Sequence, residues 1–425
     1  MSFFGPSVRN RNAVCSVWLV AAIFPIERAA LAQEAIRNSI AGDAAAESHR
    51  IDPENLPFTV KAGDLRVLVS PSIGAEYNDN INLTKENRLD DFIIRPSLGL
   101  QLSYPLTQRN LLQFDISFGY SEYLQHHSYS TWFIQSGSAL SFDLYIKDVS
   151  INLHDRFGYT QDSAREGAIA NSGTYGTFQN SVGLNATWDL QDVTLSGGYD
   201  HQNIKSTSDN FEQTDHASEM VVGRVGLKLN PRLTAGMEGT VSFTEYEQKT
   251  LNDSVNYSGG VYADWQPGTY FHLKPRFGYT IYNFEQSSRV IKAHNQDTWY
   301  ADLSVEHQVS EGINYTLSAG HETRLGIQSD TIEDWYLRPR INWSVFKAVD
   351  FSTSFFYEHG EQTSGGLPGS GETYDWYGGE LKVGYSLTKK LSLNLNYRLT
   401  LRSSDQASRE YTQNSVGLQA TYTMK

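Results

Sequence analysis

The feature that most constrains this chain is an alternation of apolar and polar residues that recurs from Leu65 to the end. Between Leu391 and Arg402, Leu or Tyr fills every second position, and Ser, Asn, Thr or Arg fills the positions between. A period of two places these two sets on opposite faces of an extended strand. One such strand fits a soluble sandwich with its leucines inward, or a membrane barrel with its leucines outward.

The connections between the alternating segments distinguish these two folds. We count 18 segments, and the predicted strands are 65–78, 91–104, 111–124, 131–146, 149–162, 178–190, 193–204, 218–229, 233–246, 255–266, 270–283, 298–309, 313–324, 333–345, 349–360, 374–387, 391–403 and 411–424. Every second connection is tight, as at 147–148, and the others are longer and polar, as at 206–217. This regularity is typical of membrane barrels, with short turns at one end and longer loops at the other. The sequence therefore predicts an all-β fold, a transmembrane antiparallel up-and-down β-barrel of about 18 strands.

The N-terminal region predicts export. Residues 1–32 combine basic residues, an apolar segment and the cleavage site "ALA", which is the pattern of a signal peptide. Residues 33–64 are polar and predict a short periplasmic N-terminal tail, and residues 65–425 form the predicted outer-membrane β-barrel. An even strand count returns the chain to its starting side, so we expect both termini in the periplasm.

Aromatic residues on the apolar face fall at two heights, which predicts two girdles at the membrane interfaces. The predicted girdle residues are Tyr104, Trp188, Trp265, Trp343 and Tyr385 near tight turns, and Tyr120, Tyr159, Tyr279 and Tyr357 farther along their strands. Asp155 also falls on this face, where a charge is costly. Either a β-bulge near Asp155 shifts the register, or Arg156 neighbours Asp155 near the outer interface, and we favour the bulge.

Charged residues of both signs occupy the opposite, inward face. The predicted pore-lining residues are Arg95, Arg156, Arg224, Glu238, Lys274, Arg276, Glu306, Arg338, Arg340, Glu380, Lys382 and Arg398. A water-filled pore whose wall selects solutes would carry such charges. Cross-strand ion pairs that only hold the strands in register would carry them as well. The sequence leaves these two interpretations open.

Composition excludes several classes of function. The net charge is −14, which argues against a nucleic-acid partner, and the single cysteine lies in the predicted signal peptide. Thiolate metal sites and disulfides are thus excluded from the mature chain. No GxSxG, HExxH or P-loop motif occurs. We expect no enzyme activity, catalytic residue, metal site or cofactor.

The run from Glu76 to Tyr104, "EYNDNINLTKENRLDDFIIRPSLGLQLSY", and the later "INLHDRFGYTQDS" resemble the outer-membrane β-barrel porin 2 family. The resemblance implies an outer-membrane barrel, and some related barrels accompany exopolysaccharide secretion. From the residues we expect a porin-like channel for passive passage of small polar solutes. The alternative is the outer-membrane conduit of an exopolysaccharide export system. Expected partners are outer-membrane lipid, lipopolysaccharide, the barrel-insertion machinery and, for the alternative, polysaccharide-export components.

Overall fold

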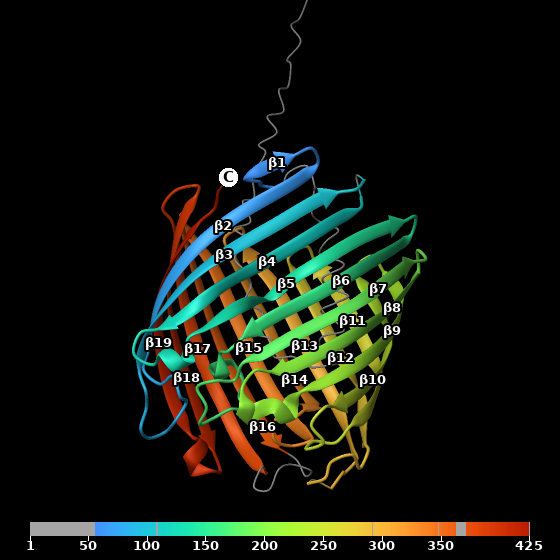
Figure 1. Cartoon of the computed structure of the whole chain (residues 1–425). Coiled ribbons are helices and arrows are strands. Elements are labelled where there is room, and N and C mark those ends of the chain that lie inside the picture. The colour runs from blue at the N-terminus through green and yellow to red at the C-terminus, as the bar shows by residue number, and fades with distance from the viewer. Residues whose placement is uncertain (1–55, 108, 291, 347, 363–370, 425) are drawn as a thin grey trace, which may run out of the picture.

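The computed structural model describes residues 56–107, 109–290, 292–346, 348–362 and 371–424. The predicted signal peptide and most of the predicted tail lie outside the described residues. No helix within the described ranges is long and apolar enough to cross a membrane. The chain forms one antiparallel sheet that closes on itself (Figure 1).

Within the described ranges the sheet has 19 strands. They are β1 (Val60–Ala62), β2 (Leu65–Asn78), β3 (Asp91–Pro105), β4 (Leu111–Tyr123), β5 (Thr131–Ile146), β6 (Val149–Thr160), β7 (Thr177–Asp189), β8 (Val193–Ser206), β9 (His216–Asn230), β10 (Leu233–Tyr246), β11 (Ser254–Gly268), β12 (Phe271–Phe284), β13 (Gln296–Ser310), β14 (Ile313–Leu325), β15 (Thr331–Phe346), β16 (Val349–Gln362), β17 (Glu372–Ser386), β18 (Leu391–Ser404) and β19 (Tyr411–Tyr422). Short 3₁₀ helices occur in the loops: η2 (His127–Tyr129), η3 (Ser163–Arg165), η4 (Asp209–Thr214) and η5 (Ala407–Arg409). All 18 predicted strands are present as β2 to β19, each with both boundaries within two residues of the prediction.

Strands β2 to β19 form the closed barrel, because each pairs with the next and β19 pairs with β2. The short β1 pairs with the first residues of β2, where β19 has already ended. Thr59 bridges this point, since the Val69 amide donates to Thr59 Oγ1 at 3.0 Å and Thr59 Oγ1 donates to the Met424 carbonyl. The start of β2 and the end of β19 thus lie at the same end of the barrel (Figure 1).

The two ends of the barrel differ in their connections. The end at which β2 begins and β19 ends carries the tight turns, and we call it the turn end; the other carries the longer loops, and we call it the loop end. The short and the long connections thus gather at opposite ends of the barrel, as their alternation along the sequence predicts.

The two faces of the barrel also follow the predicted parity. Leu395 and Met237 point outward with 51% and 69% of their surface exposed. The predicted girdle residues lie on the same outer face: Tyr104, Trp188, Trp265, Trp343, Tyr385 and Tyr279 are exposed, and Tyr120, Tyr159 and Tyr357 are half-buried. Polar residues such as Glu358 and Arg402 are buried on the inner face.

A bulge occurs in β5, not in β6 as predicted near Asp155. Between Ile134 and Ser138, β5 gains two residues relative to both neighbouring strands, with Gly137 at φ +101°. β6 pairs with β7 without a register shift, so Asp155 stays on the outer face. Its charge is met by Asn180, whose amide donates to the carboxylate at 2.6 Å.

Candidate functional site

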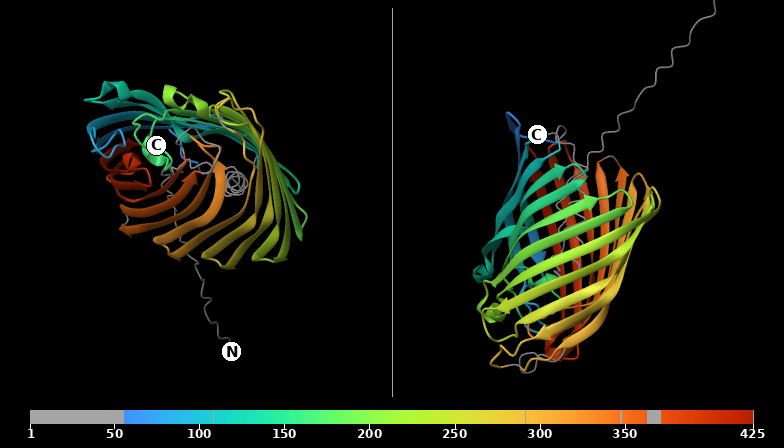
Figure 2. Two further views of the ribbon diagram at one scale, coloured as in Figure 1. Left: turned by 90° about the horizontal axis from the view of Figure 1, so that it is seen from below. Right: turned by 90° about the vertical axis from the view of Figure 1, so that its right-hand side faces the viewer.

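The connection between β6 and β7, residues 161–176, folds into the barrel instead of standing above it (Figure 2). We call it the plug loop. Its residues reach strands that are not neighbours of β6 or β7 in the sheet. The Arg398 guanidinium on β18 donates to the Ala164 carbonyl at 2.7 Å, and the Asn171 amide donates to the Ser408 carbonyl at 2.9 Å. The plug loop therefore crosses the interior.

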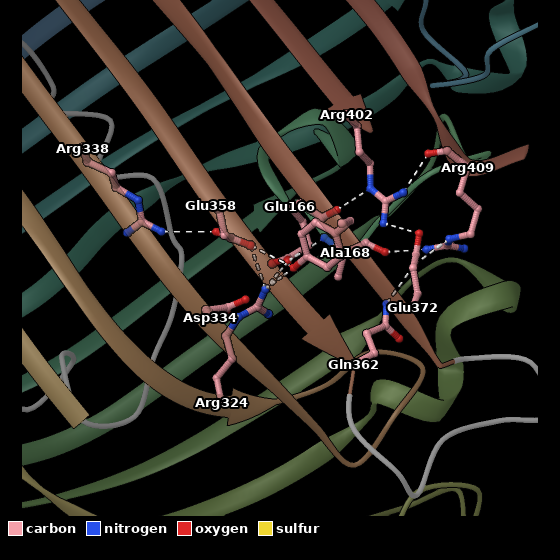
Figure 3. A network of polar contacts seen from close by, with 12 residues as sticks. Glu166, Ala168, Arg324, Asp334, Arg338, Glu358, Gln362, Glu372, Arg402 and Arg409 are labelled. Carbon is pink, nitrogen blue, oxygen red and sulfur yellow. Dashed lines mark hydrogen bonds and ion pairs between the residues drawn. The ribbon is translucent and has the colours of Figure 1, made fainter. Parts of the chain in front are cut away.

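Two more arginines hold the main chain of the plug loop (Figure 3). Arg402 Nε donates to the Gly167 carbonyl, and Arg409 Nη2 donates to the Ala168 carbonyl, both at 2.7 Å. With Arg398, three guanidiniums thus bind carbonyls within five consecutive residues of the loop. Guanidiniums offer several donors in a rigid plane, which suits this repeated capture of carbonyl oxygens.

A buried carboxylate positions two of these arginines. Glu372 lies 2.7 Å from Arg402 and 2.8 Å from Arg409, and its side chain is 1% exposed. The Gln362 amide also donates to Glu372 at 3.1 Å. A buried charge is costly unless it is paired and hydrogen-bonded. Loss of any one of these contacts should therefore destabilise the others.

One side chain of the plug loop, Glu166, joins a second network of ion pairs on β14 to β17. Glu166 lies 2.9 Å from Arg324, and Arg324 also pairs with Asp334 and with Glu358 at 3.3 Å (Figure 3). Tyr374 donates to Glu358 at 2.9 Å. One arginine thus faces three carboxylates, one of which comes from the loop.

Apolar residues from several loops pack beside these networks. The cluster consists of Leu83, Ala164, Ala168, Ile169, Ala170, Phe211, Ile327, Ile332, Tyr374, Trp376 and Tyr411. Leu83, Phe211 and Ile327 come from three connections other than the plug loop. We call this cluster, together with the plug loop, the plug. It fills part of the interior at the loop end.

Asp162 is a titratable group near the start of the plug loop. Burial raises the pKa of its carboxyl, but Arg165 at 2.7 Å and Arg398 at 3.8 Å outweigh that effect. The pKa falls to about 2. Asp162 is therefore ionised at neutral pH and helps hold the loop against β18.

The structure places the predicted inward charges on the inner face and brings several together. Glu238 accepts from Arg276 Nε at 2.8 Å and from the Tyr300 hydroxyl at 3.1 Å, and Arg224 lies 3.1 Å away. Arg95 pairs with Glu76 at 2.6 Å, and Arg338 pairs with Glu358 at 3.4 Å.

The remaining predicted residues lie on the same inward parity. Lys382 lies 3.2 Å from Glu380 on the same strand. The others, placed by their register partners on neighbouring strands, are Arg156, Lys274, Glu306 and Arg340. Arg398, one of the predicted set, contacts the plug loop directly.

Several residues that hold the plug are missing from the predicted pore lining, namely Glu166, Arg324, Asp334, Glu372, Arg402 and Arg409. Parity alone places Arg324 and Arg402 on the inner face, but it gives no partner for them. The available signal was the plug loop itself, since "AREGAIANSG" is long and rich in small residues. Small residues allow a main chain to approach a wall closely: a Cβ at Gly167 would lie 2.8 Å from Glu358.

A buried group of hydrogen-bonded side chains on β6 to β8 contains Ser, His and Asp, the residue types of a catalytic triad. His154 contacts Asp200 at 2.7 Å and Asn152 at 3.0 Å, and the Ser181 hydroxyl donates to Asp200 and not to the histidine. The His154 side chain is 1% exposed, so a substrate cannot reach it. Among the described residues, no three His, Cys, Asp or Glu side chains are grouped to hold a metal ion.

Comparison with known proteins gives only distant similarity. No family model matches the chain, and no curated protein sequence matches it. The resemblance to the β-barrel porin 2 family thus stays a prediction. Similar solved structures include the outer membrane protein OpdK of Pseudomonas aeruginosa, at 10% identity over 84% of this chain and 98% of that chain, with a TM-score of 0.45. OccK2 (OpdF) of P. aeruginosa has 12% identity over 85% of this chain and 97% of that chain, with a TM-score of 0.48. OccAB3 of Acinetobacter baumannii has 11% identity over 84% and 98%, with a TM-score of 0.45.

Proposed function

We propose that this chain is an outer-membrane channel for passive passage of small polar solutes, narrowed at its loop end by the plug. The observation that carries the proposal is the combination of a closed barrel, an apolar exposed outer face and a polar inner face crossed by an arginine-bound loop. A closed barrel leaves no strand edge unpaired in lipid, and its exposed leucines and aromatic residues suit hydrocarbon and interfaces.

The plug favours small solutes over polymers. A conduit for an exopolysaccharide needs a lumen wide enough for a chain of sugars, whereas here three arginines and Glu166 tie a loop across the interior. The polysaccharide conduit stays a prediction, and it would require the plug loop to leave its present position.

For orientation, we propose that the loop end faces the cell exterior and lipopolysaccharide, and that both termini lie in the periplasm. An epitope tag within 206–217 should bind antibody on intact cells, and a tag at Lys147 and Asp148 should not. Reversed accessibility would overturn this orientation. Cleavage after Ala32 is tested by sequencing the N-terminus of the membrane-extracted protein.

The deciding experiment is single-channel conductance of the full-length purified protein in a planar bilayer. The matched variant replaces residues 163–170 with a short Gly-Ser linker and so removes the loop contacts to Arg402 and Arg409. We expect a small conductance for the wild type and a larger one for the variant, with exclusion of larger polymers in both. If neither protein conducts, the chain is no channel.

A further inference from the structure

Glu322 on β14 carries a buried carboxyl group on the inner face of the barrel. The residue is 5% exposed, and its Oε1 has no hydrogen-bond partner in the protein. Arg324 and Arg338 are among its electrostatic neighbours, yet within the described ranges neither forms an ion pair with it. A buried carboxylate without a partner is costly, and a carboxyl group in such a place takes up a proton instead.

The charged groups around Glu322 are mostly acidic. Those that face it or its neighbours come from β12 to β16 and from the plug loop, and they are Arg276, Asp302, Arg324, Asp334, Arg338, Glu358 and Glu166, beside the hydroxyls of Tyr300 and Tyr336. Arg276 donates to Glu238 at 2.8 Å, so its charge is already met. Arg324 and Arg338 are thus left to balance several carboxyl groups, one of which is best accommodated as the neutral acid.

Asp334 lies directly across from Glu322 in the β14–β15 ladder, on the same inner face. The Cβ atoms of such direct partners are about 4.5–5.5 Å apart, and two like charges there repel. Asp334 Oδ2 accepts from Arg324 Nε, whereas Asp334 Oδ1 is buried without a donor. Because the arginine keeps Asp334 ionised, the proton of this pair belongs on Glu322. A protonated Glu322 is then the donor that Asp334 Oδ1 lacks.

The main chain around Glu322 is held independently of this proton. Beyond Ala301 and His321, β14 still pairs with β15, and the Tyr282 hydroxyl donates to the Thr323 carbonyl at 3.2 Å. The proton therefore changes the partners of side chains and not the path of the strand. The side chain concerned is Arg324, which lies two residues further along the same face.

We propose that Glu322 is a proton-binding site, whose neutral carboxyl group donates a hydrogen bond to Asp334 Oδ1 and so leaves Arg324 to hold Glu166 of the plug loop. The link to the plug rests on the proposed function, whereas the proton site does not. When the proton passes to the water of the lumen, the ionised Glu322 repels Asp334 and attracts Arg324. The pair between Arg324 and Glu166 then weakens, so alkaline pH loosens the plug loop.

Urea unfolding in lipid vesicles tests the proton site without requiring a channel. An unfolded glutamate is ionised above about pH 4.3, so at higher pH the wild type takes up a proton when it folds and loses stability as the pH rises. Glu322→Gln is neutral at every pH and needs no proton. Relative to this variant, the folding equilibrium constant of the wild type should fall about tenfold per pH unit between pH 5 and pH 7.

Glu380→Gln is the matched control, because Glu380 lies on the inner face 3.2 Å from Lys382 and is expected to stay ionised. Relative to Glu380→Gln, the wild type should show no such fall. Infrared difference spectra identify the group: at pH 7 the carbonyl band of a protonated carboxylic acid should be present in the wild type and absent from Glu322→Gln. A constant ratio of wild type to Glu322→Gln, or a band that persists in Glu322→Gln, would overturn the proton site.

Pulsed amide exchange and bilayer recordings test the link to the plug. Between pH 7 and about pH 9, where buried glutamic acids ionise, exchange in residues 163–170 of the wild type should speed up beyond the intrinsic rate change. Channel openings should also last longer, and Glu322→Gln should show neither effect. Equal changes in both proteins would overturn the link to the plug and leave the proton site to the urea and infrared results. A wild type that conducts no ions at any pH would overturn the channel alone.

Discussion

At the turn end of the barrel, consecutive strands are joined by two to five residues, and β1 and Thr59 complete the pairing of β2. At the loop end the connections run from five to 16 residues, several of them fold inward, and the β13–β14 ladder stops early. The same strands thus end in a regular rim on one side and in a packed plug on the other. The difference teaches that strand pairing builds the wall, whereas side chains from separate loops fill part of the interior at one end.

The largest expected effect lies in the plug. Arg402→Met leaves the buried Glu372 with one cation fewer and frees the Gly167 carbonyl. Breaking a buried pair in this way costs about 3–5 kcal/mol. We expect the heat-modified gel shift to move to a lower temperature and the conductance to rise. Arg398→Met is the matched control, because its side chain is 18% exposed and its loss should cost less. Equal effects of the two substitutions would contradict the central role of Glu372.

A second prediction concerns the wall that both ends share. Leu395→Arg places a charge on the apolar outer face, where Leu395 is 51% exposed, and should cost about 2–4 kcal/mol near the bilayer centre. The neighbouring Asn396→Arg adds the same charge to the inner face and should leave folding unchanged while shifting ion selectivity toward anions. Urea unfolding in lipid vesicles gives the first quantity and bilayer recordings give the second. A similar loss of stability from both substitutions would refute the assignment of faces.

Much of the wall could be predicted from the sequence, and the reason is local. Leu395 on β18 and Trp188 on β7 each alternate with polar neighbours along their own strand, so their faces follow from the pleat alone. Glu166 and Arg324 pair although they lie 158 residues apart in the sequence, and no local pattern around either residue predicts its partner. The early end of the β13–β14 ladder could not be predicted for the same reason, because both strands alternate correctly and only their pairing stops early. The Asp155 prediction failed because Asn180, on the next strand, meets the charge without a bulge.

The turn end should tolerate loss of its ion pairs. Lys228 lies 2.6 Å from Asp189, with side chains 33% and 55% exposed. Solvent-exposed pairs of this kind contribute about 0–1 kcal/mol. Lys228→Ala should therefore change neither the urea midpoint nor the gel shift measurably. A loss as large as that of Arg402→Met would erase the contrast between the two ends.

Another small expected effect is a dependence on pH at the loop end. The folded pKa of Asp162 is about 2, below the ordinary value near 3.9, so its contribution is full above about pH 4 and is lost as the pH falls through about 2. Its side chain is 43% exposed, so the contribution should be under about 1 kcal/mol. Amide exchange in residues 163–170 at pH 5 and pH 3 should differ beyond the intrinsic rate change. Asp162→Asn should remove that difference; an unchanged difference would place the titrating group elsewhere.

The bulge in β5 sets a rule for how this wall can change length. Its two additional residues leave Ile134 and Leu140 both pointing outward, because an even number returns the chain to the same side of the pleat. Removing Ser136 alone would turn every side chain from 137 to 146 to the opposite side, sending Leu140 into the lumen and Asp143 into lipid. Removing 136–137 together would cost only the local protrusion. In β5 an extra pair of residues is thus accommodated without exchanging the outward and inward side chains on either side of the bulge.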